Sequence, residues 1–409
     1  MSVASVRVET MSIFTGITMA PPDPILGVTD AFKADPRPTK VNLGVGIYQD
    51  DTGKLPLMQS VALAEARIAA HPVPRPYLSI DGNPDYDALT AQLVLGADSP
   101  ALTTGASITV QTLGGSGALK VGGDFLRSLG ATDVLVSDPT WDNHRPILTG
   151  AGLRVGTYRY YDAAARAVDF EGMVDDLRIA PPGTVVLLHG CCHNPTGYDL
   201  TPIEWMKVLD VVTVGQLIPF VDMAYQGFAD GIDQDALAIR SIARRGLTGL
   251  CSNSFSKTFG LYGERVGGLT LITASADEAA RVRSQVKLKV RANYSNPPTH
   301  GEAIVNTILA DDELRAIWVD EVAGMRDRIK AMRAALVDGL KAQGITDDLS
   351  FITNQRGMFS YMGLGRPQMV RLREEFGVYG VESGRLCVAA LNPSNVDYVA
   401  KCVAAVMAD

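Results

Sequence analysis

Seven short apolar segments of β type, separated by stretches with a helical pattern, constrain the fold of this chain more than any other feature. Most of these segments are apolar throughout rather than alternating, which is typical of strands covered on both faces. The strand segments are residues 108–112, 134–136, 153–158, 184–188, 218–221, 247–251 and 268–272. Helical patterns between them include residues 118–129 and 202–214. The alternation predicts an α/β fold with a doubly wound, mostly parallel, seven-stranded sheet.

The remaining parts of the chain predict a second domain and an N-terminal arm. A chain of 409 residues is too long for one ordinary domain core. A long helical pattern over residues 312–343 leads from the sheet toward a smaller C-terminal domain, and shorter helical patterns occupy residues 28–33 and 60–70. Residues 1–27 contain three closely spaced prolines, which favour an extended arm, with plain disorder as the alternative.

Composition excludes several classes of protein. Charged residues make up 20% and hydrophobic residues 46% of the chain, as in a soluble globular enzyme. A net charge of −8 argues against binding to nucleic acid, which requires a basic surface. No apolar run approaches the length of about 20 residues that spans a bilayer, and the first 16 residues lack the apolar core of a signal peptide. The five cysteines form no disulfide framework, so we expect a reducing compartment, the cytoplasm.

One lysine carries the strongest chemical signal. Lys257 follows an apolar strand end and lies among small hydroxyl residues, with Arg265 eight positions later. A lysine held against a packed wall has a lowered pKa, and its neutral amine condenses with a carbonyl group. Ser254, Ser256 and Arg265 are residue types that hold a phosphate. A lysine for an aldehyde beside an anion clamp indicates pyridoxal phosphate, with an ordinary serine-rich surface loop as the alternative.

Other polar motifs also follow strands of the predicted sheet. Gly115 and Ser116 lie where a strand leads into a helix, a place where backbone N–H groups bind anions. Trp141 offers a flat face for a ring. Asp222 ends an apolar strand, where a carboxylate needs a cationic partner such as a pyridinium nitrogen. An ordinary turn or a core tryptophan would explain each motif singly, but all of them lie at strand ends of one sheet.

Two further motifs leave their function open. Residues 41–48 place two glycines beside an aromatic ring, which indicates either a close approach of the backbone to a ligand or a tight turn. Cys191, Cys192 and His193 could suggest a metal site. Adjacent cysteines do not easily bind one tetrahedral ion together, so no metal is predicted.

Taken together, these residues resemble the class I pyridoxal-phosphate aminotransferases, in particular the aspartate and aromatic amino-acid group. The resemblance extends from about Ile25 to the C-terminus and implies pyridoxal-phosphate fold type I. Its motifs are residues 111–117, 191–197, 222–228, 252–265, 291–298, 354–360 and 383–385. The division expected for this fold is an arm over 1–27, a small α/β domain over 28–52 and 325–409, and a large cofactor-binding domain over 53–324.

The resemblance implies a role for each matching residue. The catalytic residues would be Lys257, which carries the cofactor, and Asp222 and Tyr225, which contact its ring. The cofactor site would comprise Tyr77, Gly115, Ser116, Trp141, His144, Asn194, Asp222, Tyr225, Ser254, Lys257 and Arg265. The substrate site would comprise Gly46, Trp141, Asn194, Arg291, Phe359 and Arg385. Arg385 would bind the α-carboxylate. Tyr77 and Arg291 would reach the site of the partner in a homodimer with shared active sites.

The activity implied is transamination between an L-amino acid and 2-oxoglutarate by ping-pong kinetics. The expected pocket residues resemble both branches of the family, the aspartate and the aromatic aminotransferases. Asn296 resembles the aspartate branch. Several residues of a second set resemble the aromatic branch, and this set is Ile47, Gln49, Leu55, Pro76 and Ser116. A lyase or decarboxylase on the same fold is an alternative, although it would not need Arg291. A cofactor-sensing regulator would need a basic DNA-binding extension, for which the chain has neither length nor charge.

Overall fold

The computed structural model describes residues 12–21, 23 and 25–408, and its centre is a seven-stranded sheet. The strand order is β2-β10-β9-β8-β7-β3-β4. The strands are β2 (Ser107–Leu113), β3 (Asp133–Asp138), β4 (Arg154–Arg159), β7 (Val185–His189), β8 (Ile218–Met223), β9 (Gly249–Ser254) and β10 (Val266–Ile272). Only β10 runs antiparallel to its two neighbours, and the other pairs are parallel. The predicted α/β fold with a mostly parallel sheet is therefore confirmed.

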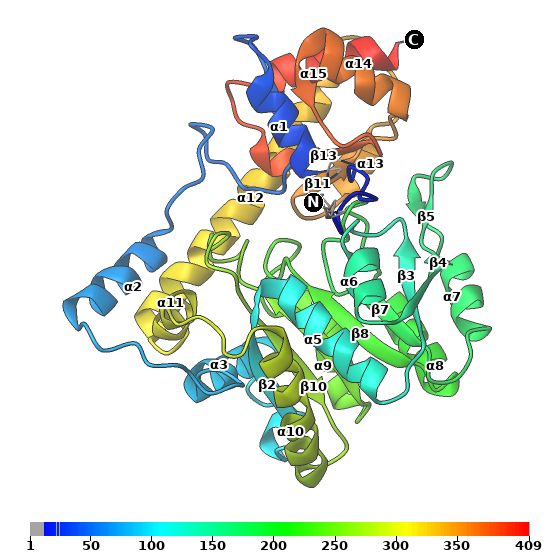
Figure 1. Cartoon of the computed structure of the whole chain (residues 1–409). Coiled ribbons are helices and arrows are strands. Elements are labelled where there is room, and N and C mark those ends of the chain that lie inside the picture. The colour runs from blue at the N-terminus through cyan, green and yellow to red at the C-terminus, as the bar shows by residue number, and fades with distance from the viewer. Residues whose placement is uncertain (1–11, 22, 24, 409) are drawn as a thin grey trace, which may run out of the picture.

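Two layers of helices cover the sheet, because its strands are apolar on both faces. Adjacent residues of β8 point to opposite faces of the sheet. Phe220 belongs to the apolar cluster that includes α5 (Gly114–Ser128), α6 (His144–Gly150) and α10 (Ala276–Asn293), and Val221 belongs to the cluster on the other face. Figure 1 shows α5 and α10 on the near side of the sheet. The near layer comprises α5, α6 and α10. The far layer comprises α3 (Pro84–Leu95), α4 (Pro100–Thr103), α7 (Phe170–Arg178), α8 (Pro202–Val214) and α9 (Leu237–Arg244).

The last part of the chain and a short N-terminal segment form a second group of elements, which the long helix α12 (Asp312–Ala342) joins to the sheet. Figure 1 shows α12 rising from the sheet region to this group. The group contains α1 (Leu26–Ala34), β1 (Val41–Asn42), α13 (Ser350–Asn354), β11 (Phe359–Tyr361), α14 (Arg366–Phe376), β12 (Val378–Tyr379), β13 (Arg385–Cys387) and α15 (Val396–Met407). Beside the sheet lie α2 (Gln59–Ala70), α11 (His300–Leu309) and the hairpin of β5 (Tyr161–Asp162) and β6 (Ala167–Val168).

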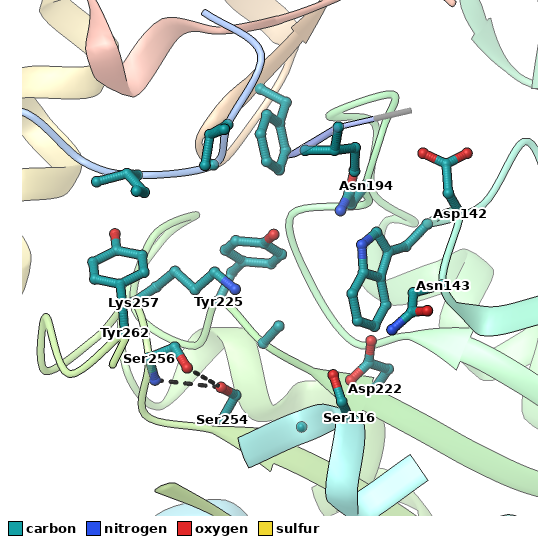
Figure 2. A pocket seen from close by; sticks show the side chains of 18 of the residues that line it. Ser116, Asp142, Asn143, Asn194, Asp222, Tyr225, Ser254, Ser256, Lys257 and Tyr262 are labelled. Carbon is teal, nitrogen blue, oxygen red and sulfur yellow. Dashed lines mark hydrogen bonds between the residues drawn. The ribbon is translucent and has the colours of Figure 1, made fainter. Parts of the chain in front are cut away.

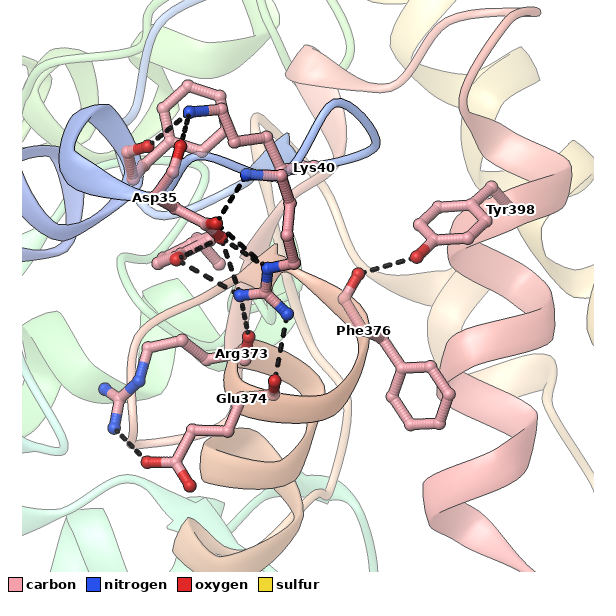
Figure 3. Close-up of polar contacts among 9 residues, drawn as sticks. Asp35, Lys40, Arg373, Glu374, Phe376 and Tyr398 are labelled. Atoms are coloured by element: carbon pink, nitrogen blue, oxygen red, sulfur yellow. Dashed lines mark hydrogen bonds and ion pairs between the residues drawn. The ribbon is translucent and has the colours of Figure 1, made fainter.

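Polar contacts fasten the N-terminal segment to the C-terminal group (Figure 3). Strand β1 pairs in parallel with β12. The Arg37 guanidinium donates to the backbone carbonyls of Arg373 and Glu374 at the end of α14 and forms an ion pair with Asp35. These contacts explain why a segment near the N-terminus belongs structurally with the last part of the chain. The predicted division into domains, with its boundary at residue 325 inside α12, stays a prediction.

The sequence predicted the seven strands of the sheet and the helices α1, α2, α5, α8 and α12, with ends that differ from the observed ones by no more than about four residues. Helix α8 occupies the predicted residues, and α12 ends one residue earlier than predicted. Helix α5 begins at Gly114 rather than at residue 118, because the glycine-rich run has weak helix propensity but still forms the first helical turn. Helix α1 begins at Leu26, so the last residues of the predicted arm are helical. The arm prediction for residues 1–11 lies outside the described residues. No helix in the described part of the chain is long and apolar enough to cross a membrane.

Candidate active site

A cavity of about 480 Å³ opens at the carboxyl ends of the central strands, where α/β sheets bind ligands. Figure 2 shows side chains from the strand ends of the sheet converging on it from below. The C-terminal group closes the other side through Phe359 and Arg385. The predicted residues that line the cavity are Gly46, Gly115, Ser116, Trp141, Asn194, Asp222, Tyr225, Ser254, Lys257, Arg265, Phe359 and Arg385.

Asp222 lies at the end of β8, and neighbouring elements hold its carboxylate. Its register partner on β9 is Ser252, whose hydroxyl donates to Asp222 Oδ1 at 2.8 Å. His144 Nε2 lies 3.1 Å from Oδ2, and Thr140 Oγ1 lies 2.7 Å from the other ring nitrogen of His144. Burial raises the pKa of Asp222, but its hydrogen bonds with His144 and Ser252 and the electrostatic effect of His144 prevail and hold the pKa below its ordinary value. The site therefore presents a buried anion to any ring in the cavity.

Lys257 lies in the turn after β9, and its side chain reaches toward Tyr225 (Figure 2). Its Nζ atom is 5.3 Å from the centre of the Tyr225 ring. Desolvation in the cavity is the main reason that the pKa of Lys257 is lowered to about 8; the Asp222 charge opposes this shift, and the guanidinium groups of Arg265 and Arg385 add to it. No carboxylate in the described residues lies within 4.0 Å of Nζ to keep it protonated. The amine is thus available as a nucleophile and as a base.

A second feature of the cavity is a cradle for an anion. Ser254 and Ser256 face each other with their hydroxyls 3.1 Å apart, and the Arg265 guanidinium donates to Ser256 Oγ at 3.4 Å. A Cβ atom on Gly114 would lie 3.0 Å from Arg265 Nη2, so glycine keeps the start of α5 close to the guanidinium. Arg265 has no carboxylate partner among the residues described. Hydroxyls, a helix N-terminus and an unpaired guanidinium fit a phosphate group.

A second cation stands at the opposite side of the cavity. Arg385 is buried, donates to Asn194 Oδ1 at 3.0 Å and to the Gly44 carbonyl at 2.7 Å, and stacks on the Phe359 ring at 4.2 Å. A Cβ atom on Gly46 would lie 2.6 Å from the Phe359 ring, so only glycine allows this close approach. The Arg385 Nε group is buried without a partner. The guanidinium is therefore able to bind a carboxylate group that enters the cavity.

Three predicted residues do not line the cavity. His144 lies behind Asp222, as the resemblance implies. Tyr77 is 92% exposed, and Arg291 is exposed on α10 beside Ser295. Tyr77 and Arg291 do not line the cavity of the one chain that the structure describes, and their implied roles stay predictions.

The sequence motifs include several residues that shape the site but to which no role was assigned. The Ser252 contact with Asp222 arises from strand register, which has no local signal. Tyr262 lines the cavity, and its hydroxyl accepts a hydrogen bond from the Tyr48 backbone N–H. His189 also lines the cavity with both ring nitrogens unpartnered, and burial lowers the pKa of His189 to about 3. Its place at the end of an apolar strand was a usable signal.

The lysine, the anion cradle and the buried carboxylate, all at the strand ends of one sheet, define a pyridoxal-phosphate enzyme of fold type I. The Arg265 guanidinium, with the serine hydroxyls beside it, fits the phosphate of that cofactor. The buried Asp222 carboxylate fits its protonated ring nitrogen. The chain belongs to the class I and II aminotransferases, because the family model described as "Aminotransferase class I and II" matches residues 38–403. It is a pyridoxal-phosphate-dependent aminotransferase.

Named relatives cover almost the whole chain. It is 52% identical over 399 residues to an aspartate aminotransferase of Pseudomonas aeruginosa, with 97% of this chain and 100% of the relative covered. It is 51% identical to an aromatic-amino-acid aminotransferase of Escherichia coli, with 94% and 98% covered. An aromatic-amino-acid aminotransferase from Burkholderia pseudomallei, solved covalently bound to pyridoxal phosphate, superimposes with a TM-score of 0.94 at 56% identity, covering 97% of this chain and 100% of that one.

Proposed function

We propose that the enzyme transfers the amino group of aspartate and of the aromatic amino acids tyrosine and phenylalanine to 2-oxoglutarate. The observation that carries this proposal is the buried Arg385, a cation without a carboxylate partner, in one cavity with Lys257. The relatives named as aspartate and as aromatic-amino-acid aminotransferases support both substrate classes. A lyase or decarboxylase on this fold is not favoured, since the named relatives are aminotransferases.

Each side chain has a defined task in this proposal. Bound pyridoxal phosphate supplies an electron sink for the substrate's α-carbon. Lys257 Nζ would take the proton from that carbon as a base and deliver it, as an acid, to the carbon that was the cofactor's aldehyde carbon, and a pKa of about 8 suits both roles near neutral pH. Asp222, oriented by His144, keeps the ring nitrogen protonated, and Trp141 stacks on the ring. Tyr225 and Asn194 contact the ring oxygen. Gly115, Ser116, Ser254 and Arg265 hold the phosphate, Arg385 holds the α-carboxylate, and Gly46 and Phe359 line the substrate pocket.

A homodimer completes this proposal. Four large apolar side chains that lie close together in the sequence are exposed on the single chain, and packing against a second copy would remove them from water: Leu55, Leu57, Val73 and Tyr77. We place Tyr77 at the partner's phosphate and Arg291 at the side chain of the partner's substrate.

We also propose a cytoplasmic enzyme, which agrees with five cysteines that are all buried and unpaired.

Mixed dimers test the shared site. Co-expression of Lys257→Ala and Arg291→Ala chains should restore about a quarter of the wild-type activity on aspartate, because half of the dimers are mixed and each contains one intact site. The measurement is aspartate turnover by differently tagged chains, with each variant alone as the control. If the mixture is no more active than the Arg291→Ala enzyme alone, both residues act within one chain and the shared site is wrong.

Substrate range depends on Arg291. Arg291→Leu should lower kcat/KM for aspartate by an amount equivalent to roughly 3–5 kcal/mol of transition-state stabilisation, as for the loss of one partner of a buried ion pair. The kcat/KM for phenylalanine should stay within about tenfold of the wild-type value. Single-turnover half-reactions measure the two donors separately from the acceptor. Arg281→Leu, an exposed arginine on the same helix, is the control. A wild type that uses only dicarboxylates, or a variant that loses both classes equally, would contradict the proposed range.

A further inference from the structure

Arg333 is a buried cation that the proposed mechanism does not use. It lies on α12 with 1% of its surface exposed, and no carboxylate in the described part of the chain lies within 4.0 Å of it. Burial lowers the pKa of Arg333 to about 10, so the side chain remains a cation near neutral pH. A buried charge without a counter-ion is unfavourable unless other groups compensate for the lost hydration.

Backbone carbonyls supply that compensation, and they belong to the segment that carries Phe359. Arg333 Nη2 donates to the carbonyl of Gly357 at 2.5 Å and to that of Phe359 at 2.7 Å, and Nη1 lies 3.5 Å from the Ile352 carbonyl. One guanidinium therefore connects the middle of α13, the turn that follows this helix and the first residue of β11. Its planar fork fixes several carbonyls at once, which a lysine does not do.

The fixed segment packs on both sides against parts of the active site. Strand β11 pairs with β13, which begins at Arg385, and the Phe359 ring lies 4.2 Å below the Arg385 guanidinium. Gly357, at φ +75°, leaves so little room that a Cβ atom there would lie 2.4 Å from Cys192 Cβ. The Arg356 N–H donates at 2.7 Å to the carbonyl of Gly197, in the loop that carries Asn194. A shift of this segment would move two of the three groups that Arg385 contacts, the Phe359 ring and the Asn194 side chain, whereas the Gly44 carbonyl belongs to another part of the chain.

We propose that Arg333 is a positioning residue for substrate binding: its hydrogen bonds to the Gly357 and Phe359 carbonyls hold Phe359 against Arg385, and so set the Arg385 guanidinium for the substrate's α-carboxylate. The inference rests on the proposed role of Arg385. Arg333 reaches the cavity only through this segment, because it does not line the cavity itself. The effect should therefore appear mainly in carboxylate binding, because Arg333 donates to none of the residues that hold the cofactor's phosphate.

The test measures binding of two unreactive carboxylates, 3-phenylpropionate and succinate, to the holoenzyme. Arg333→Met keeps the bulk of the side chain but removes the donors. It should weaken both ligands by about tenfold or more, since small misplacements of a binding group have large effects, and leave the cofactor's dissociation constant within about twofold. Both ligands should weaken to a similar extent, because they share the 2-carboxyethyl group, whose carboxylate Arg385 holds, and differ only at the other end. Arg333→Lys should lie between this variant and wild type, because it keeps the charge but not the fork.

The control is Leu336→Ala, a buried residue one turn along the same helix. It lowers stability by opening a cavity but leaves the Arg333 hydrogen bonds in place. At an equal loss in Tm, Leu336→Ala should bind both carboxylates like wild type. Combining Arg333→Met with Phe359→Leu should weaken binding less than the product of the single effects, because both act on one contact.

Several results would overturn the proposal. Carboxylate affinities of Arg333→Met within twofold of wild type would exclude a positioning role, and so would equal weakening in Leu336→Ala. If Arg333→Met does not fold, Arg333→Lys takes its place in the test. Unchanged carboxylate affinity in Arg333→Lys would also exclude a positioning role, and a partial loss of affinity would support the proposal. A wild-type enzyme that binds neither carboxylate would contradict the role of Arg385, and with it the proposed function rather than Arg333 alone.

Discussion

Lys257→Ala is expected to lower turnover by at least about 10⁴-fold, because the variant loses the nucleophile and the proton carrier together. The amine owes its reactivity to the cavity, where desolvation lowers the pKa of Lys257 to about 8. The anion cradle of Ser254, Ser256 and Arg265 remains in the variant, so it should still bind the cofactor. Turnover and cofactor affinity, measured on the same preparation, separate the two effects.

Borohydride reduction gives a direct check on the position of this lysine. It should attach the cofactor of the wild-type enzyme to a single peptide, the one that contains Lys257. Lys289→Ala, a lysine on α10 outside the cavity, is the matched control and should be labelled and active like wild type. Labelling of a different lysine would mean that the assignment of Lys257 is wrong.

Asp222→Ala is expected to lower kcat/KM by about 10²–10⁴-fold. The carboxylate is the buried anion that faces the cofactor ring, and removing one partner of such a pair is expensive in a low-dielectric site. The variant also leaves the Ser252 hydroxyl and His144 Nε2 without their partner. Asp222→Glu should be milder, because it keeps the charge. The measurement is a single-turnover half-reaction with aspartate.

Ser252→Ala is the control for Asp222, because it removes one hydrogen bond and keeps the carboxylate. A neutral hydrogen-bond donor to a charged group contributes about 1.5–3 kcal/mol, so this loss should be smaller than that of the aspartate. Since hydrogen bonds hold the pKa of Asp222 below its ordinary value, the carboxylate stays ionised as pH falls through the weakly acidic range. The acid limb of the pH–rate profile should therefore belong to another group. Near-normal turnover in Asp222→Ala would exclude the proposed role at the ring nitrogen.

The sequence alone was sufficient for the sheet and for most residue types of the site. Continuous apolar runs identify strands covered on both faces, because burial on two sides leaves no place for alternation. Polar motifs directly after these runs identify the ligand-binding edge, because parallel strands end together. The motifs around Lys257, Asp222 and Arg265 therefore predict cofactor residues, and the fold brings all three to one cavity.

Only the tertiary structure decided how these residues are held. Strand β9 extends beyond its apolar part through Ser252 to Ser254, and the register with β8 brings Ser252 to Asp222. The support of Arg385 combines Phe359 with Asn194, which lies 191 positions away along the chain. Arg333 lies in the long helical pattern beside other charged residues, and nothing local in the sequence indicates that it is buried against a backbone turn. Hydrophobic periodicity is a local property, whereas register and packing depend on contacts between distant segments, and no local pattern encodes these pairings.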